Sequence, residues 1–383
     1  MKIPFNKPAA VGAELANIAD ALARGHLSGD GFYTKQCHRW LEQRLGAKRA
    51  LLTHSCTGAL EMSAMLSVGA GDEVVMPSYT FVSTANAFAL RGAVPVFVDV
   101  RADTINIDER LIEAAITPRT KAIAVVHYAG VACEMDAILA IAAKHNLMVV
   151  EDAAQALLAT YKGRNLGTLG QLGCISFHET KNLISGEGGA LLINDAQLIE
   201  RAEIVREKGT NRSRFLRGEV DKYTWVELGS SFLPSELVAA FLAAQLEHAE
   251  SVIARRRAIW ARYHAGLASV AAAGALELPR ASYADREPNA HIFHVMTDSL
   301  ETRLALAAHL KARDMLSVSH YVPLHSSPGG LRWGRAAGSF EVTDRVAERL
   351  LRLPIYYGIG DAEVDAVIDA VKGFYAARGD VRR

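Results

Sequence analysis

The stretch Cys174-Ile-Ser-Phe-His-Glu-Thr-Lys-Asn-Leu-Ile-Ser-Gly-Glu-Gly-Gly-Ala-Leu-Leu-Ile193 places one lysine in a polar turn between two apolar runs. The runs, Cys174 to Phe177 and Ala190 to Ile193, have the length and composition of buried strands. Lys181 stands in the turn, and the three glycines after it let the backbone pass close to a bound group or adopt a positive φ. A lysine beside glycines is more often part of a surface turn, so Lys181 becomes a site candidate only with support from the rest of the chain.

Strand-like and helix-like patterns alternate through the first two-thirds of the chain. The strand-like runs are Ala50 to Leu52, Glu73 to Met76, Val94 to Val98, Ala122 to Val126 and Leu147 to Val150. Helical spacing of apolar residues occurs in Gly12 to Arg24, Thr34 to Leu45, a stretch that ends near Ser67, Ala85 to Leu90 and Ala137 to Lys144. Such alternation predicts an α/β fold with a mainly parallel sheet that helices cover on both faces.

The chain of 383 residues is longer than one ordinary core, so two domains are expected. We assign residues 1–250 to a large α/β domain with an N-terminal arm and residues 251–383 to a smaller α+β domain. The boundary lies in or beside a long helical pattern from about Glu236 to Ala272. The smaller domain is expected to contain strand-like runs at Ile292 to Met296 and Leu316 to Val318, a helix near Thr302 to Arg313 and a closing helix from about Asp361.

Acidic and basic residues are equally numerous, 42 of each, so no overall field would attract nucleic acid or an anionic membrane surface. No apolar run reaches the roughly 18 residues of a membrane span, and the N-terminus lacks the apolar core of a signal peptide. The four cysteines are scattered, without the paired spacing of a metal site. We therefore expect a cytoplasmic, enzyme-sized protein without a metal. The run Arg255-Arg256-Arg257 is expected to lie on a helix face and the terminal Arg382-Arg383 in a frayed tail, and neither is expected to be a binding patch.

Polar residues that directly follow the apolar runs are the most informative, because ligands of an open α/β sheet bind beyond the carboxyl ends of its strands. Ser55-Cys56-Thr57-Gly58 opens a helix with hydroxyls and free amides, which suits a phosphate, although most such residues are simple helix caps. Glu151-Asp152 follows Leu147 to Val150, where an acidic pair is costly unless it meets a partner. That partner is either a structural cation or a ligand.

Together with Lys181, these motifs match the requirements of pyridoxal 5′-phosphate: a phosphate anchor, a carboxylate for the pyridine nitrogen and an amine that joins the aldehyde. Such a lysine also moves the proton. A nicotinamide dehydrogenase would need glycines that open a helix after a strand, whereas Gly186 to Gly189 precede a strand-like run. The Gly-x-Ser-x-Gly elbow of a serine hydrolase is missing from the sequence. A non-catalytic regulator on the same fold is harder to exclude.

The motifs taken together resemble those of the DegT/DnrJ/StrS family of nucleotide-sugar aminotransferases. They are Gly29-Asp30-Gly31, Ser55-Cys56-Thr57, Met76-Pro77-Ser78-Tyr79-Thr80-Phe81, Glu151-Asp152-Ala153-Ala154-Gln155, Ser176-Phe177-His178-Glu179-Thr180-Lys181-Asn182 and Gly186-Glu187-Gly188-Gly189. The resemblance covers nearly the whole chain and implies the fold-type-I architecture of pyridoxal-phosphate enzymes. It argues against a regulator, and against the dehydratase branch of the family, in which histidine replaces the lysine.

The resemblance also implies a role for individual residues. It makes Lys181 the lysine that holds the cofactor and Asp152 the partner of the pyridine nitrogen. The remaining cofactor contacts that it implies are Gln155 near the phenolic oxygen, Phe81 on the ring face, and Thr57, Gly58 and Ser176 at the phosphate. For Phe81, ordinary core packing is the alternative.

The same resemblance suggests the substrates. Several further segments are most similar to the branch of the family that aminates carbon 4 of dTDP-4-dehydro-6-deoxy-D-glucose, with L-glutamate as donor, to the galacto product used for enterobacterial common antigen. The residues expected to contact this nucleotide sugar are Lys208, Arg212, Tyr223, Trp225, Tyr321 and His325. The gluco isomer and a 3-amino sugar stay open as products, because the catalytic motifs are the same for all three.

A homodimer with shared active sites is a further implication of the resemblance. Many family members carry Gly-Tyr-Asn-x-Arg after a long loop, and its asparagine reaches the cofactor phosphate of the partner subunit. Here the segment is Gly229-Ser230-Ser231-Phe232-Leu233. Ser231 is expected to replace that asparagine as a cofactor contact, with a shorter reach.

Overall fold

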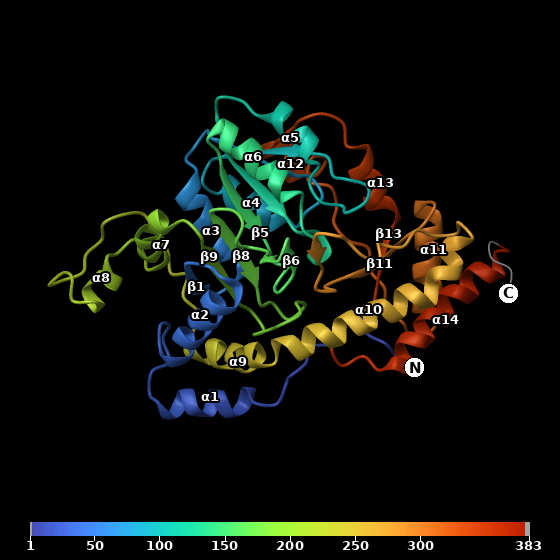
Figure 1. Ribbon diagram of the computed structural model, residues 1–383, viewed down its shortest axis with the longest axis horizontal. Helices are drawn as coiled ribbons and strands as arrows, with labels where there is room; N and C mark the ends of the chain where they lie inside the picture. Colours follow the sequence, from blue (N-terminus) through green and yellow to red (C-terminus); the bar gives the residue numbers. More distant parts are fainter. Residues whose placement is uncertain (1, 380–383) are drawn as a thin grey trace.

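The structure of the chain is a computed structural model that describes residues 2–379 (Figure 1), so Arg382-Arg383 lie outside the described residues. Within these residues the centre is an eight-stranded sheet in the order β1-β9-β8-β5-β4-β2-β3-β12. All pairings are parallel except those of β9, which runs opposite to both of its neighbours. The prediction of a mainly parallel sheet is therefore confirmed. The strands are β1 (Arg49–Thr53), β2 (Glu73–Pro77), β3 (Val94–Val98), β4 (Thr120–Val126), β5 (Met148–Asp152), β8 (Leu172–Ser176), β9 (Gly189–Ile193) and β12 (Arg335–Ala336).

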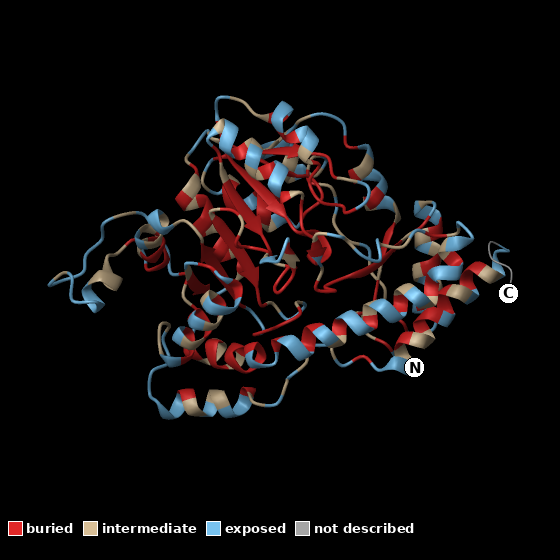
Figure 2. Ribbon diagram, viewed as in Figure 1, coloured by how far each residue is buried: buried red, intermediate tan, exposed pale blue. Residues whose placement is uncertain are grey.

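Helices cover both faces of this sheet. Val75 of β2 and Val149 of β5 belong to one buried apolar cluster, whereas their neighbours Val74 and Val150 belong to another, because successive strand residues point to opposite faces. The first cluster includes residues of α2, α6 and α9, and the second includes residues of α3, α4 and α7. Figure 2 shows the strands buried along their length. The helices of this part are α1 (Glu14–Ala23), α2 (Phe32–Leu45), α3 (Cys56–Ser67), α4 (Val82–Ala89), α5 (Glu109–Ala115), α6 (Met135–His145), α7 (Ile199–Arg206), α8 (Arg212–Leu216) and α9 (Glu236–Glu247).

The C-terminal part builds a second apolar core around an antiparallel pair of strands, β11 (Phe293–Met296) and β13 (Leu350–Leu353). Ile3 from the N-terminus belongs to this core, and β12 extends the large sheet beside β3. The two parts therefore exchange segments, and the proposed boundary at residue 250 falls at the start of α10, where it stays a prediction. The other elements are α10 (Ala249–Ala272), α11 (Leu300–Lys311), α12 (Pro328–Trp333), α13 (Glu341–Arg349), α14 (Asp361–Ala377), and a small sheet of β10 (Arg286–Glu287), β6 (Thr160–Tyr161) and β7 (Arg164–Asn165).

Two predicted elements differ from the structure. The helical pattern from Glu236 to Ala272 is two helices, α9 and α10, bent by 63° at the break, because α9 packs on α1 and α2 whereas α10 packs on α14. The predicted strand Leu316 to Val318 is not formed, since Val318 makes only an isolated bridge with Arg352. In residues 2–379 no single helix has the length and apolarity to cross a membrane, and α9 with α10 meets that test only as a bent pair.

The two strands around Lys181 form the predicted pair and end against α3. Ser176 and Gly189 lie opposite each other in the antiparallel register of β8 and β9. A Cβ at Gly189 would lie 2.4 Å from the backbone nitrogen of Cys56, closer than non-bonded atoms approach. Glycine is therefore required at this position, and the close approach places the turn with Lys181 beside the first residues of α3.

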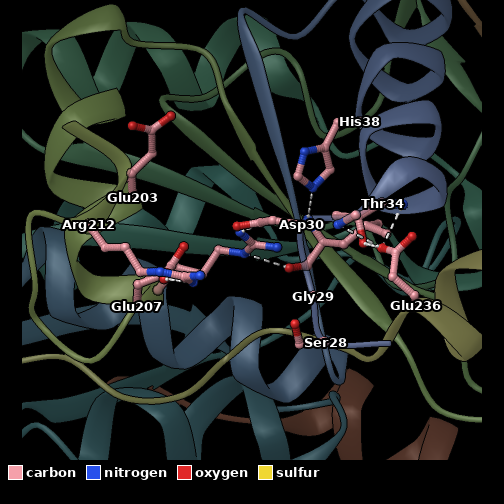
Figure 3. A network of polar contacts seen from close by, with 12 residues as sticks. Ser28, Gly29, Asp30, Thr34, His38, Glu203, Glu207, Arg212 and Glu236 are labelled. Carbon is pink, nitrogen blue, oxygen red and sulfur yellow. Dashed lines mark hydrogen bonds and ion pairs between the residues drawn. The ribbon is translucent and has the colours of Figure 1, made fainter. Parts of the chain in front are cut away.

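A buried glutamate joins the N-terminal segment to α9 (Figure 3). The carboxylate of Glu236 accepts hydrogen bonds from the backbone amides of Gly31 (3.0 Å), Tyr33 (2.8 Å) and Thr34 (3.1 Å), and from the Thr34 hydroxyl. These amides open α2 and have no partner within that helix. The favourable interaction of an anion with a helix N-terminus adds to the hydrogen bonds. A Cβ at Gly31 would lie 2.5 Å from the Glu236 side chain, which explains one glycine of the Gly-Asp-Gly motif.

Replacing Glu236 by alanine should lower the free energy of unfolding by about 3 kcal/mol, because several donors would be left without an acceptor. The measurement is chemical unfolding followed by circular dichroism at fixed protein concentration. Glu247→Ala, at the exposed other end of α9, is the matched control, and its change should stay within about 0.5 kcal/mol. Indistinguishable unfolding curves for the two variants would contradict the role given to Glu236.

Candidate active site

A cavity of about 460 Å³ opens at the carboxyl ends of the parallel strands. One wall comes from the sheet and its helices, with Asp152 at the end of β5, Ser176 at the end of β8 and Thr57 at the start of α3. Lys181 lies in the same wall. The C-terminal part supplies the opposite side, which includes Arg256, His291, His320, Tyr321 and Arg352. The structure thus brings the three sequence motifs together in one cavity.

The two adjacent acids at the end of β5 have different surroundings. Glu151 accepts hydrogen bonds from the amides of Gly167 (2.8 Å), Leu169 (2.6 Å) and Gly170 (2.6 Å), and its Oε2 lies 2.9 Å from Nε2 of His127. Glu151 is therefore the structural member of the pair. Because successive strand residues face opposite sides, the next residue points away from this network.

Asp152 is buried and faces the cavity. The Thr84 hydroxyl donates to its Oδ2 (2.7 Å) and the amide of Ala154 donates to its Oδ1 (3.1 Å). Thr84 is itself 2.9 Å from the Thr80 hydroxyl. No lysine, arginine or histidine in residues 2–379 forms an ion pair with Asp152, so its charge is available to a bound group.

Lys181 is largely buried, and its backbone amide donates to the carbonyl of His178 (2.9 Å). Burial lowers the pKa of its amine below the ordinary value, and the positive charge of Arg352 acts in the same direction. The charge of Asp152 and the thiol of Cys56 partly oppose this lowering. The result is an amine with a larger uncharged fraction near neutral pH than an exposed lysine has.

Several hydrogen-bond donors gather at the start of α3. Ser55 caps the helix by accepting from the amide of Gly58 (3.0 Å), which leaves the amides of Cys56 and Thr57 without a partner in the described structure. The Thr57 hydroxyl lies 2.9 Å from that of Ser83, and Ser176 completes this end of the cavity. These groups suit a phosphate.

Gly58 itself lies outside the lining of the cavity. Its amide is used by the Ser55 cap, and a Cβ at this position would lie 2.7 Å from the His54 ring. The glycine is explained by this packing. Its predicted contact with the cofactor stays a prediction.

The other predicted ring contacts, Gln155 and Phe81, also line the cavity. Gln155 accepts from the amide of Ala129 (2.7 Å) and donates to the Tyr321 hydroxyl (2.8 Å). Phe81 lines the cavity, 6.1 Å from the Tyr321 ring, and is 54% exposed. Core packing is therefore the wrong interpretation of Phe81.

Most residues predicted to contact the nucleotide sugar lie away from the cavity of their own chain. Tyr321 lines it, but His325 packs on Phe340 with ring centroids 3.8 Å apart and lies 2.8 Å from the Ser78 hydroxyl. The others lie on or beside an arm around α8 that projects from the body (Figure 1), which we call the α8 arm and define as residues 208–228. It carries Lys208, Arg212, Tyr223 and Trp225, and Ser231 follows it.

Two cavity residues escaped the sequence analysis. Arg256 lies in α10, as expected for the run Arg255 to Arg257, but it is buried, and it donates to the carbonyls of Ala290 (3.1 Å) and His291 (2.7 Å). Its burial was not predicted, because it depends on how α10 packs on the C-terminal core. Arg352 interrupts the apolar run of β13, and a charge inside such a run was the one signal that could have identified it.

The donor set fits pyridoxal phosphate on the evidence of the structure alone: free helix amides and hydroxyls at one end, an unpaired carboxylate in the middle, and an amine of lowered pKa beside it. The cavity volume of about 460 Å³ lies in the range typical of small-molecule sites. An arrangement of this kind can activate a carbon next to a nitrogen.

Comparison with known proteins gives consistent results. Residues 9–372 match the DegT/DnrJ/EryC1/StrS aminotransferase family. Over 379 residues the chain is 34% identical to the spore coat polysaccharide biosynthesis protein SpsC of Bacillus subtilis, covering 97% of this chain and 96% of that protein. It is 37% identical over 309 residues to dTDP-3-amino-3,4,6-trideoxy-alpha-D-glucose transaminase of Streptomyces venezuelae, covering 80% and 77% of the two chains. The solved structure of the aminotransferase TlmJ from Streptoalloteichus hindustanus superposes with a TM-score of 0.90 at 33% identity, covering 99% of this chain and 100% of that one.

The lowered pKa of Lys181 predicts its reactivity. Acetylation by acetic anhydride requires the uncharged amine, so the labelling rate of Lys181 should reach its half-maximum at a pH below the ordinary lysine value of 10.5. Asp152→Asn should lower this midpoint further, because the carboxylate favours the charged amine. Mass spectrometry of the digest, with the exposed Lys121 as internal reference for reagent concentration, measures both. A midpoint at or above 10.5 would contradict the environment described for Lys181.

Proposed function

The chain belongs to the DegT/DnrJ/EryC1/StrS family of pyridoxal-phosphate-dependent sugar aminotransferases, and we propose that it transfers the amino group of L-glutamate to carbon 4 of dTDP-4-dehydro-6-deoxy-D-glucose. The observation that carries the catalytic part of the proposal is the placement of Lys181 and the unpaired Asp152 in one cavity. The products would be 2-oxoglutarate and dTDP-4-amino-4,6-dideoxy-D-galactose.

The cofactor would be held by the residues already described. The amides of Cys56 and Thr57 and the hydroxyls of Thr57 and Ser176 would bind its phosphate, and Phe81 would cover its ring. Further contacts would come from Gln155 at the ring oxygen and Asp152 at the ring nitrogen, whereas Gly58 would act indirectly, by letting the start of α3 pack on His54. When bound, pyridoxal phosphate supplies an electron sink for negative charge on the carbon next to the transferred nitrogen.

Asp152 and Lys181 would divide the proton chemistry. The Asp152 carboxylate, held by Thr84 and Ala154, keeps the ring nitrogen protonated by charge. The Lys181 amine would remove the proton from the carbon that bears the nitrogen and would return a proton to the carbon on the other side of that nitrogen. Burial assists, because a lowered pKa leaves this amine able to accept a proton near neutral pH.

The substrate and the stereochemistry rest on similarity alone. The segments that carry it are Lys208 to Arg212, Asp221 to Trp225 and His320 to His325. A 3-amino product is the alternative that the Streptomyces venezuelae relative represents, and the gluco isomer at carbon 4 is another. We place the product in the synthesis of a surface polysaccharide such as enterobacterial common antigen.

The four cysteines are free and buried, which fits a reducing cytoplasm.

A homodimer with shared sites would give the α8 arm its role. The arm exposes large apolar side chains that one chain leaves uncovered, among them Leu216, Tyr223, Trp225 and Leu228; Trp225 is 72% exposed. Such a patch is typical of a protein interface. In the dimer the partner subunit would cover these apolar side chains of the α8 arm. The arm would then bring Lys208 and Arg212 to the diphosphate bound by the partner, with Ser231 near the partner's cofactor phosphate.

The function is tested by the product. Protein loaded with pyridoxal phosphate should show an absorbance band in the near-ultraviolet to violet that L-glutamate bleaches, and turnover with dTDP-4-dehydro-6-deoxyglucose should give an amino sugar. A small proton coupling between carbons 3 and 4 in its NMR spectrum is expected for the axial amine of the galacto product. A large coupling would indicate the gluco isomer and overturn only the stereochemical part. Lys181→Ala should bind the cofactor and lose turnover, and retained turnover would exclude Lys181 as the catalytic lysine.

The shared site is tested by mixing inactive variants. Lys181→Ala and Ser231→Trp, on opposite sides of the proposed interface, should each be inactive and regain part of the activity when subunits exchange. Each variant mixed with itself is the control. Sedimentation equilibrium should show a dimer, and a fully active monomer would rule the shared site out.

A further inference from the structure

A second cavity, of about 450 Å³, lies beside the active-site cavity, and Ile292 lines both. Its walls come from the loop after β3, from α10, from the segment between α10 and β11, and from α13. The two cavities are similar in size, and each is large enough for a small molecule. The aminotransferase chemistry uses only the first.

The buried part of the second cavity is apolar around one histidine. Ile105, Ile292 and Val346 supply the apolar surface. His294 is 8% exposed, and its Nδ1 has no hydrogen-bond partner among residues 2–379. Burial, and after it Arg352, lowers the pKa of His294 to about 4, so its ring is uncharged near neutral pH. A buried polar atom without a partner is costly, and a ligand with a polar edge would remove that cost.

Three residues of the lining have an unusual backbone conformation. Ile105, Ala129 and Ala290 have positive φ angles of 61°, 56° and 55°. This left-handed region is unfavourable for any residue with a Cβ, and most of all for a β-branched one such as isoleucine. Residues held in such conformations collect at ligand-binding and switch regions. Their presence around one cavity therefore indicates a site and not a simple gap in the packing.

Two arginines and two aromatic side chains line the more open part of the cavity. Arg280 and Arg345 are exposed, and neither forms an ion pair with a carboxylate of residues 2–379. Trp260 and Tyr283 are half-buried, and the Arg280 guanidinium lies 5.2 Å from the centre of the Tyr283 ring. Guanidinium groups bind phosphate through paired hydrogen bonds, and aromatic faces pack on flat rings.

Two of the three acidic residues in this lining are engaged by other arginines. Asp103 is held by Arg101 at 2.9 Å, and Glu287 lies 3.9 Å from Arg257. The third, Glu277, is exposed and forms no ion pair within the described residues. The donors of the two unpaired arginines are therefore available to an anion.

A nucleoside monophosphate combines the groups that this lining can bind. Its base is a flat ring with a polar edge, which suits the apolar surface and the unpartnered Nδ1 of His294. Its phosphate suits Arg280 and Arg345. Inorganic phosphate would leave the apolar part unfilled, and an uncharged nucleoside would leave the arginines without an anion.

The second cavity shares a wall with the active site. The amide of Ala129, a lining residue, donates to Gln155 of the active site (2.7 Å). The ring of Tyr128 lies 6.3 Å from that of His294, and its hydroxyl lies 2.7 Å from Nδ1 of His320, which lines the active site. An occupant of the second cavity would thus contact the groups that position active-site side chains.

We propose that the second cavity is a regulatory site for a nucleoside monophosphate, with the base beside His294 and the phosphate at Arg280 and Arg345. Binding at this site is independent of the proposed aminotransferase function. The regulatory effect rests on that function, because it is an effect on the reaction with the amino donor.

Binding is tested by calorimetric titration of the cofactor-loaded protein with AMP and with dTMP. At least one of the two should bind, and the corresponding nucleoside and inorganic phosphate should each bind at least about 10-fold more weakly. Arg280→Gln combined with Arg345→Gln should weaken nucleotide binding by at least about 10-fold and leave nucleoside binding unchanged. Arg39→Gln is the control, since Arg39 is an exposed arginine of α2 outside both linings, and it should bind as the unaltered protein does.

Hydrogen exchange followed by mass spectrometry locates the bound nucleotide. Exchange should slow in residues 102–105 and 280–288, which line the second cavity. Ser282→Trp, a change at an exposed position of the lining, should remove both the binding and the protection. Melting temperatures identify any variant that fails to fold, and the surface variant of Arg280 and Arg345 then carries the test.

The regulatory effect is measured as the L-glutamate concentration that half-maximally bleaches the cofactor band. A saturating nucleotide should change this concentration by at least about 3-fold in the unaltered protein and leave it unchanged in the variant of Arg280 and Arg345. No binding by either nucleotide, or protection confined to residues 55–58 of the active site, would overturn the inference. Binding in the second cavity without any change in the L-glutamate dependence would overturn the regulatory role. A protein that binds the nucleotide there but responds to no amino acid would support the binding site and overturn the proposed function.

Discussion

The packing of Gly189 against the first residues of α3 is the constraint on which the site depends. β9 runs opposite to its neighbours, so its first residue lies at the sheet edge where the parallel strands end. Because no side chain fits at Gly189, the turn with Lys181 is held against the free amides of α3. The amine and the phosphate-binding donors are thus positioned by backbone contacts, and such rigidity is what holds reacting groups in a productive geometry.

The charges of the cavity are arranged for ligands more than for one another. Glu151 is satisfied inside the protein by three amides and by His127, whereas its neighbour Asp152 faces the cavity without a cation. Arg352 faces the same cavity without an anion. An ion pair between the two would neutralise both charges, so neither would be available to a charged ligand. Keeping them apart costs stability, which the protein recovers when charged ligands bind.

The sequence predicted those elements whose formation depends on neighbouring residues in the chain. The strands of a doubly covered sheet are apolar throughout, so β2 to β5, β8 and β9 were identified within a few residues. The bend between α9 and α10 was not predicted, because it arises from the packing of the two helices on different neighbours. Arg256 and Arg352 were missed for the same reason: which side of α10 or β13 meets the cavity depends on packing between parts distant in sequence. Asp152 became a candidate because it stands at the end of a recognisable strand pattern, and Lys181 because it stands in the turn between two such patterns and is supported by the other motifs.

The groups for catalysis and the groups predicted to recognise the sugar lie in different parts of the chain. The groups that move protons lie on the rigid edge of the sheet, whereas the α8 arm projects from it (Figure 1). Inside the cavity, His320 lies 2.7 Å from the Tyr128 hydroxyl and stacks on Tyr321 at 3.7 Å. Burial, and after it Arg352, lowers the pKa of His320, so the ring is neutral and offers a sugar hydroxyl a hydrogen bond without a charge. A neutral imidazole can accept a hydrogen bond from a sugar hydroxyl on either face of the hexose, so this ring does not by itself select the face that meets Lys181.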